Sequence, residues 1–175
     1  EGFGHADLDT MEPVTTATVF RVGSVSKVFT AAALMRLAEE GDVDLDAACT
    51  NYIPEAAMRP RFGDPPPTVR QLVNYHSGVP GDIHRLAYST TPYNDYTDWL
   101  AGETYPFLPP DTVYNYSNSG FTLAGIVVER ANTTGLDFPA YGTDRLFEPL
   151  AMGSTSFRKD RASISNNLAR TYVYD

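Results

Sequence analysis

Two short patterns in this 175-residue sequence combine residue types that can form and break acyl bonds. Ser24 stands three positions before Lys27, and Tyr116 stands two positions before Asn118. A serine hydroxyl becomes a nucleophile when a neighbouring base takes its proton, and a lysine amine or a tyrosine phenolate can be that base. An asparagine amide can donate a hydrogen bond to a substrate carbonyl. These four side chains would therefore support acyl transfer through a covalent serine ester.

The first pattern lies where a helix is expected to begin. From Ser24 the apolar residues follow the 3.6-residue helical repeat, and Gly41 is a typical helix stop. A spacing of three places the Ser24 hydroxyl and the Lys27 amine on one helix face. The positive potential of a helix start favours an alkoxide and disfavours an ammonium, so a partly desolvated Lys27 could accept the serine proton. On this pattern alone, an ordinary serine N-cap is the simpler interpretation.

The second pattern reverses that preference. Tyr116 and Asn118 come just before a helix predicted over about residues 119–131. From an extended segment, two side chains spaced by two positions can point the same way. A phenol beside a cation is stabilised as phenolate, so Tyr116 could share the serine proton with Lys27.

The other predicted elements are short. Residues 3–20 predict one or two strands, and a helix is predicted over about Val69 to Tyr75 with Thr68 as its N-cap. The proline-rich stretch between residues 42 and 68 predicts a loop with turns. A second serine–lysine pair, Ser156 and Lys159, has no apolar periodicity around it and is set aside.

Four longer stretches resemble the serine β-lactamase and penicillin-binding-protein superfamily, in particular its branch of class C β-lactamases, DD-peptidases and family VIII esterases. They are VFRVGSVSKVFTAAALMRLAEEGDVDLD, TVRQLVNYHSGVP, YNYSNSGFTLAGIVVERANTTG and FEPLAMGSTSF, in the order usual for that branch. Several ordered matches are far more specific than one four-residue pattern. The resemblance covers the chain from about Gly2 to Tyr172. It implies an α/β (α+β) fold with an antiparallel sheet flanked by helices, an α-helical lobe, and an active site in the cleft between them.

The resemblance also implies a role for each residue of the two patterns. Ser24 is expected to be the acylated nucleophile, and Lys27 to share or remove its proton. Tyr116 is expected to be the general base that later activates water or an acceptor, and Asn118 to contact a substrate amide or Lys27. The Ser24 backbone N–H would be one donor of the oxyanion hole. No cofactor and no metal are expected.

One departure from the family concerns its third motif. The family carries Lys-Thr-Gly or His-x-Gly on a strand near its C-terminus, which supplies the other oxyanion donor, and neither occurs after Tyr116. The family domain is also considerably longer. We therefore expect residues 1–175 to be the N-terminal portion of one catalytic domain. Because open sheet edges and uncovered apolar surface are costly, we expect a complementary C-terminal chain from the same precursor to associate with it.

The composition of the chain bears on which classes of partner it can bind and on where in or outside the cell it is located. The net charge of −9 and the pI near 4.7 disfavour nucleic acid and anionic membrane surfaces. No apolar run reaches the ~20 residues that span a bilayer. The single cysteine, Cys49, cannot form an internal disulfide and is expected to be a buried, inert thiol. Sequons at Asn115 and Asn132 support secretion weakly, so a secreted or periplasmic location is expected and a cytoplasmic one stays open.

The sequence thus predicts a serine hydrolase or acyltransferase with a small-molecule or peptide substrate. Carboxylic esters, D-amino-acid peptides or amides, and β-lactams are all open as substrates. The alternative from another class is a non-catalytic sensor of the same fold that binds β-lactams or peptides. Aromatic residues between Tyr88 and Tyr105, with Trp99, are candidates for lining a cleft, and His76 is expected to pack or to form hydrogen bonds.

Overall fold

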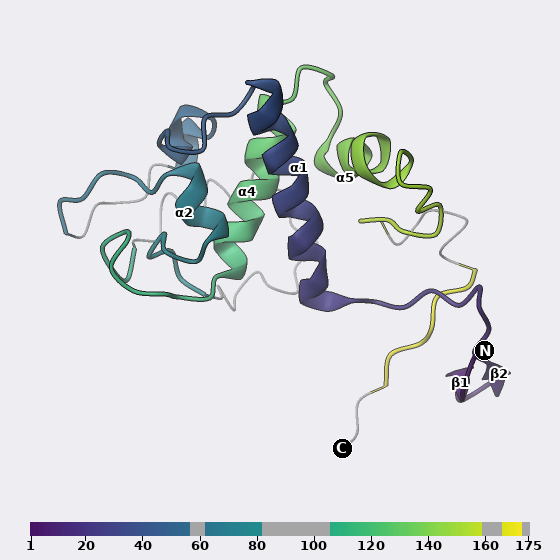
Figure 1. Ribbon diagram of the computed structural model, residues 1–175. Coiled ribbons are helices and arrows are strands. Elements are labelled where there is room, and N and C mark those ends of the chain that lie inside the picture. Colours follow the sequence, from purple (N-terminus) through teal and green to yellow (C-terminus); the bar gives the residue numbers. More distant parts are fainter. Residues whose placement is uncertain (57–61, 82–105, 159–165, 173–175) are drawn as a thin grey trace.

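The computed structural model describes residues 1–56, 62–81, 106–158 and 166–172 (Figure 1). The predicted cleft aromatics between Tyr88 and Tyr105, and also Lys159, lie outside these ranges. The helices are α1 (Ser26–Glu40), α2 (Val69–Val73), α4 (Asn118–Ala131) and α5 (Phe138–Gly142), the strands are β1 (His5–Asp7) and β2 (Glu12–Pro13), and short 3₁₀ or π turns lie at Gly23–Val25, Cys49–Asn51, Pro54–Ala56 and Thr143–Phe147.

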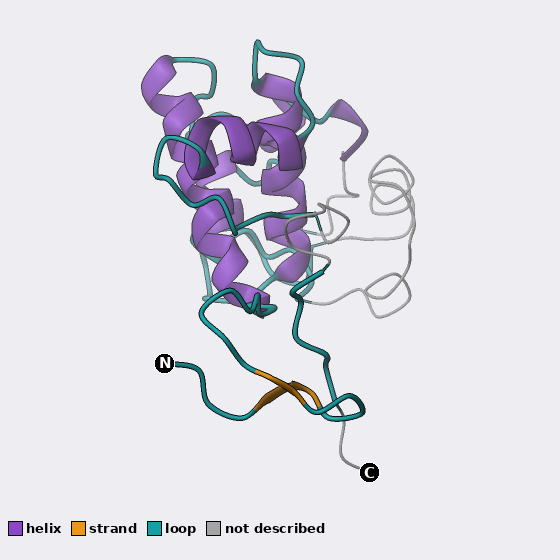
Figure 2. Cartoon of the chain, turned by 90° about the vertical axis from the view of Figure 1, so that its right-hand side faces the viewer, coloured by secondary structure: helices purple, strands orange, loops and turns teal. Residues whose placement is uncertain are grey.

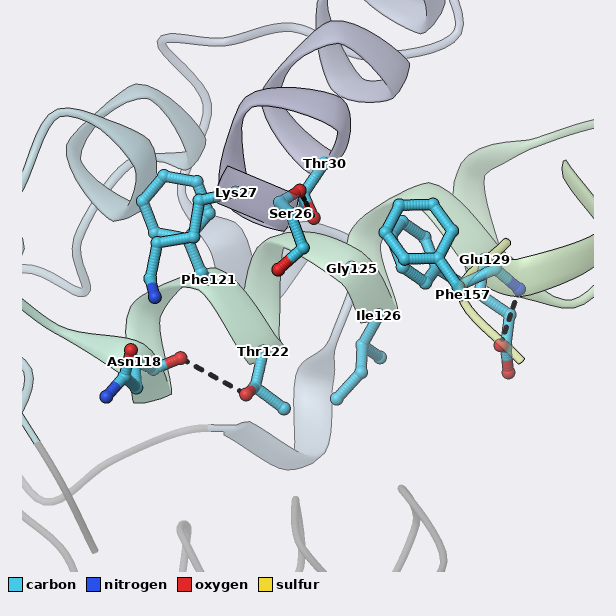
Figure 3. A pocket seen from close by; sticks show the side chains of 11 residues that line it. Ser26, Lys27, Thr30, Asn118, Phe121, Thr122, Gly125, Ile126, Glu129 and Phe157 are labelled. Atoms are coloured by element: carbon cyan, nitrogen blue, oxygen red, sulfur yellow. Dashed lines mark hydrogen bonds between the residues drawn. The ribbon is translucent and has the colours of Figure 1, made fainter. Parts of the chain in front are cut away.

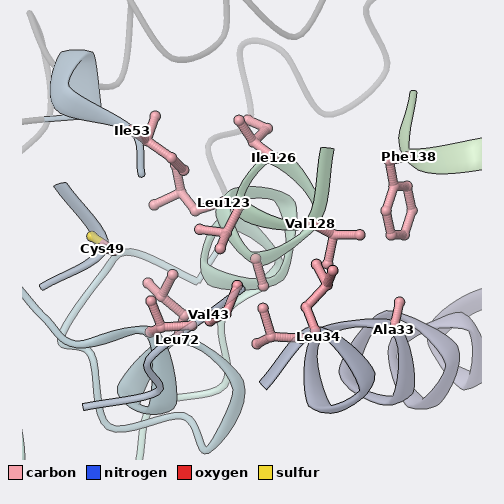
Figure 4. Close-up of a cluster of buried hydrophobic side chains, with 14 of the residues drawn as sticks. Ala33, Leu34, Val43, Cys49, Ile53, Leu72, Leu123, Ile126, Val128 and Phe138 are labelled. Carbon is pink, nitrogen blue, oxygen red and sulfur yellow. The ribbon is translucent and has the colours of Figure 1, made fainter. Parts of the chain in front are cut away.

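The helices α1 and α4 lie side by side and form the centre of the molecule, with α2 against α4 and α5 beside both (Figures 1 and 2). Their facing sides enclose one apolar core, part of which Figure 4 shows. Cys49 is fully buried in this core, and burial raises the pKa of its thiol to about 11. The expected burial of Cys49 is confirmed, and a thiol with so high a pKa is a poor nucleophile. The largest fully buried core side chains are Leu34, Leu37, Ile53, Val69, Leu72, Val79, Leu123, Val127, Val128 and Tyr141.

The helix α1 begins two residues later than its apolar pattern predicts. Gly23, with φ of +51°, opens a 3₁₀ turn that holds Ser24, and regular helix starts at Ser26. The predicted stop is confirmed, because Gly41 adopts φ of +85° and Asp42 N donates to Leu37 O at 2.9 Å. Ser24 therefore lies in a tight turn at the N-terminal end of α1.

The helix α2 has the predicted N-cap and an earlier end. The Thr68 hydroxyl accepts a hydrogen bond from Gln71 N, and the Gln71 side chain accepts one from Thr68 N, which is a complete capping box. The helix ends at Val73, because Tyr75 turns the backbone into the left-handed region with φ of +66°. The predicted end at Tyr75 is two residues too late.

The helix α4 begins at Asn118, one residue before its predicted start. Its N-cap is Ser117, which is fully buried and accepts a hydrogen bond from Gly120 N at 2.9 Å. At its other end, Asn132 is buried and its amide donates to three backbone carbonyls. The side-chain amide of Asn132, the first residue of the second sequon, therefore caps the C-terminal end of α4.

The two strands form an antiparallel hairpin at the N-terminus, apart from the helices (Figure 1). The segment 166–172 runs beside it, since Val19 N donates to Asn167 O at 2.8 Å and Arg170 N donates to Ala6 O at 2.9 Å. This hairpin is the antiparallel sheet of the described part of the chain. No helix in that part is long and apolar enough to cross a membrane. The secreted or periplasmic location stays a prediction.

Candidate active site

Three of the four predicted site residues meet at one oxygen. Lys27 Nζ lies within hydrogen-bond distance of Ser24 Oγ at 3.1 Å, and the Tyr116 phenolic oxygen lies 2.7 Å from the same atom. The Lys27 Nζ also lies 4.8 Å from the centroid of the Tyr116 ring. Both distances to Ser24 Oγ are within the range at which a proton can be transferred. The geometry therefore permits either the amine or the phenol to serve as the base.

The N-cap interpretation of Ser24 is wrong. The N-cap position of α1 is Val25, and that helix has no side-chain cap hydrogen bond. The hydroxyl of Ser26 donates to Gly23 O at 2.7 Å and so braces the turn. The Ser24 hydroxyl points instead toward Lys27 and Tyr116, on an exposed part of the surface.

A line of backbone carbonyls holds Tyr116 in place. Successive carbonyls of Val79, Pro80 and Gly81 accept hydrogen bonds from the Asn115 amide at 2.9 Å, the Ser117 hydroxyl at 2.8 Å and Asn118 N at 2.8 Å. A Cβ atom added at Gly81 would lie 2.9 Å from Tyr116 O, so only glycine permits this close approach. Ser117 is consequently buried, while the side chain of Tyr116 reaches Ser24 and Asn118 lines the same groove as Lys27.

Asn118 and Lys27 lie at one end of a groove between α1 and α4 (Figure 3). The groove has a volume of about 240 Å³. Its other end holds Phe157 and Glu129, whose Oε2 accepts a hydrogen bond from Phe138 N at 3.0 Å. Hydroxyl groups and aromatic rings line the groove, which suits part of a small organic molecule. The remaining lining residues are Ser26, Thr30, Phe121, Thr122, Gly125 and Ile126.

The weaker sequence features have structural roles. His76 Nδ1 lies 2.9 Å from Asn74 O, and its ring contacts the edge of Tyr114. Outside the two motifs, Asp46 in the loop after α1 forms a two-point ion pair with Arg70 at 2.7 and 2.9 Å. Among the residues that the structure describes, no group of three or more His, Cys, Asp or Glu side chains could hold a metal ion.

Sequence reasoning missed Tyr75, which stacks on the Tyr116 ring with centroids 4.9 Å apart. Tyr75 precedes His76 in the stretch LVNYHSGVP, and its aromatic type alone did not separate it from the other tyrosines. The available signal was its place directly after a short capped helix, where glycine is the usual residue.

A family model described as beta-lactamase matches residues 1–173. The chain is a member of the beta-lactamase family. The predicted superfamily is thereby confirmed.

Two solved structures share the fold, namely EstCE1, described as a hydrolase with promiscuous acyltransferase activity, and the D-amino acid amidase of Ochrobactrum anthropi SV3 complexed with D-phenylalanine. EstCE1 is 25% identical with a TM-score of 0.80, over 95% of this chain and 46% of its own. The amidase is 28% identical with a TM-score of 0.80, over 99% of this chain and 47% of its own.

Among curated proteins, this beta-lactamase family chain is similar to penicillin-binding protein 4* of Bacillus subtilis (strain 168). The two are 28% identical over 185 residues, which is 99% of this chain and 38% of the relative. The chain thus spans about a third of the length of its curated relatives and just under half of the two solved structures. The predicted fold of an antiparallel sheet with helices and a helical lobe is confirmed at the level of this family.

Proposed function

We propose that the protein is a serine hydrolase or acyltransferase that works through a covalent ester on Ser24. The observation that carries this proposal is the convergence of the Lys27 amine and the Tyr116 phenol on Ser24 Oγ, at 3.1 and 2.7 Å. A serine that only caps a helix needs neither neighbour. Membership of a family with hydrolase neighbours supports the same conclusion.

In the acylation step, Ser24 Oγ attacks the carbonyl carbon of the substrate. Its proton passes to the phenolate form of Tyr116 or to the neutral amine of Lys27, the carbonyl π electrons move to oxygen, and a tetrahedral intermediate forms. When the carbonyl re-forms, the bond to the leaving group breaks and the same base returns the proton to that group. The products are an ester on Ser24 and a free alcohol or amine.

In the second step, the same residues work in the opposite order. The phenolate of Tyr116 takes a proton from water or from an acceptor alcohol or amine, which attacks the acyl carbon of the Ser24 ester. The bond between that carbon and Ser24 Oγ then breaks, and Tyr116 returns the proton to Ser24 Oγ. Water gives hydrolysis, and another acceptor gives transfer. The Ser24 N–H, in the first turn before α1, is the proposed first donor to the intermediate's oxyanion, since the first N–H groups of a helix have no intrahelical acceptor.

The substrate class is proposed from the site and the relatives together. Asn118 lies beside Lys27 at the mouth of the groove, where its amide can donate to the carbonyl of a substrate amide. A relative that is a D-amino acid amidase and another that is a hydrolase with acyltransferase activity support esters and D-amino-acid amides or peptides as substrates. β-Lactams contain the same reactive acyl bond and stay in the proposal.

A labelling experiment separates an enzyme from a sensor of the same fold. Full-length protein is treated with a fluorescent penicillin and with p-nitrophenyl esters, D-alanyl peptides and a chromogenic cephalosporin. For an enzyme we expect labelling at Ser24 together with release of at least one product. Stable labelling without release of any product supports the non-catalytic sensor, and no labelling at all contradicts both.

We also propose that a further part of a family domain, in the same polypeptide or in a second chain from the same precursor, covers the outer face of α1. That face is apolar, since Val25 is 56%, Val28 66% and Met35 46% exposed, and Ala32 between them is also exposed. The spacing of these residues forms one stripe along the helix, opposite the buried side. Since the chain covers 46% of EstCE1, enough of that fold lies outside the match to supply a cover.

Native mass spectrometry of the protein isolated from its source tests this partner. We expect a longer polypeptide or a complex of two chains. A single chain of 19.2 kDa that stays monomeric and folded would contradict the proposal.

A further inference from the structure

Tyr75 adopts a backbone conformation that a bulky residue rarely takes. It follows Asn74, the C-cap of α2, and has φ of +66°. The amide of His76 donates to Gln71 O at 3.2 Å, which is the closing bond of a Schellman motif. Glycine is the usual residue at this position, because a Cβ atom strains the left-handed conformation. The strain at Tyr75 therefore needs a compensating contact.

The compensating contact is with the candidate base. The Tyr75 ring stacks on the Tyr116 ring at 4.9 Å between centroids and 21° between planes. The rings of Phe121 and Tyr114 also pack against the Tyr75 ring, and each of their centroids lies 5.3 Å from that of Tyr75. The Tyr75 carbonyl also accepts a hydrogen bond at 2.8 Å from the amide of Asn115, the residue before Tyr116. Tyr75 thus holds both the ring and the backbone approach of the base.

A glycine at this position would relax the backbone and would still offer the carbonyl to Asn115. Only the side chain is lost in that comparison, so the contacts of the Tyr75 ring and hydroxyl with Tyr116 are what the strained conformation supports. The ring contributes no atom to the contacts on Ser24 Oγ, which come from Lys27 and Tyr116. Its position fits an indirect role, exerted through the orientation of Tyr116.

We propose that Tyr75 is a positioning residue, whose stacked ring fixes the plane of the Tyr116 phenol so that its oxygen stays against Ser24 Oγ. This inference rests on the proposed acyl-transfer function. Stacked aromatic rings prefer a narrow range of offsets, so the stack restricts rotation of the phenol. A catalytic group that is displaced by about 1 Å can lose up to about 100-fold in rate.

The protonation state of Tyr75 suits this role. Burial, followed by the negative charge that Tyr116 and Tyr114 would carry when ionised, raises the pKa of Tyr75 above its ordinary value. Tyr75 therefore holds its proton more firmly than an ordinary tyrosine does. A neutral ring beside the base orients it without competing for the serine proton.

Two substitutions at one position test the proposal in the full-length protein. Tyr75→Phe keeps the planar ring and should keep kcat within about twofold, whereas Tyr75→Leu keeps apolar volume without a planar face. For the leucine variant we expect kcat to fall by about 10- to 100-fold with KM within about twofold, because the loss affects the base and not substrate binding. A role in folding alone would instead lower the amount of active protein, which active-site titration with a fluorophosphonate measures.

Two further variants complete the design. Tyr114→Leu is the matched control, since Tyr114 also packs on Tyr75, and it should keep kcat within about threefold. Tyr75→Gly relaxes the left-handed backbone, so this variant should remain folded even if the leucine variant does not. Its kcat should fall by as much as is expected for the leucine variant.

The outcomes separate this inference from the proposed function. Equal kcat values per titrated site for wild type and for the leucine and glycine variants would overturn the positioning role, and so would a phenylalanine variant as slow as the leucine variant. If wild-type Ser24 takes up no fluorophosphonate, the proposed function itself fails, and the positioning role fails with it.

Discussion

Replacing Ser24 by alanine is expected to abolish formation of the covalent adduct and to lower turnover of every substrate by on the order of 10⁴-fold or more. The reason is chemical, because the Ser24 hydroxyl is the proposed nucleophile at which Lys27 and Tyr116 meet. The side chain is exposed and lies outside the apolar core, so the free energy of unfolding should change by about 0.5 kcal/mol or less. Intact-protein mass after penicillin or fluorophosphonate treatment measures the adduct, and thermal unfolding measures the stability.

Ser154→Ala is the matched control for this experiment. Ser154 is also an exposed serine, on the segment after the π turn, and its substitution should leave both adduct and turnover unchanged. A Ser24→Ala protein that still hydrolyses p-nitrophenyl esters at the wild-type rate would show that another nucleophile does the work. The assignment of the two motifs would then have to be abandoned.

The local elements could be predicted because short stretches of sequence determine them. The apolar repeat of α1, its stop at Gly41 and the capping of α2 by Thr68 each depend on residues within a few positions. The start of α1 could not be placed as well. A left-handed Gly23 opens a 3₁₀ turn there, and an apolar repeat does not distinguish a 3₁₀ turn from the first turn of an α-helix.

The assembly of the site depended on the resemblance and not on spacing. Ser24 and Tyr116 are separated by 92 positions, and no local pattern states that their oxygens lie 2.7 Å apart. The carbonyls of Val79 and Pro80 that help to hold Tyr116 carry no side-chain signal, since any residue supplies the same backbone acceptor. Tyr75 was missed for a related reason, because its left-handed backbone contradicts its residue type.

Replacing Tyr116 by phenylalanine should slow both acylation and deacylation by about 100-fold or more, as the loss of a general base usually does. The substitution removes only the phenolic oxygen. The ring can still stack on Tyr75 at 4.9 Å between centroids, and Lys27 Nζ can still lie 4.8 Å from the ring centroid. The fold and the orientation of Lys27 should therefore persist, and the measured loss reports on the oxygen alone. Pre-steady-state kinetics with a p-nitrophenyl ester separate the acylation burst from the later turnover.

Three outcomes of that measurement show which residue is the base in each step. Slower rates in both the acylation burst and the later turnover identify Tyr116 as the base that takes the proton of the serine and that of water. A slower second phase alone leaves Lys27, whose Nζ lies 3.1 Å from Ser24 Oγ, as the base for acylation. Near-normal rates in both phases contradict a catalytic role for the phenol and transfer both steps to the lysine. Tyr114→Phe is the control, because it removes the same oxygen from an exposed tyrosine two positions earlier and should change neither phase.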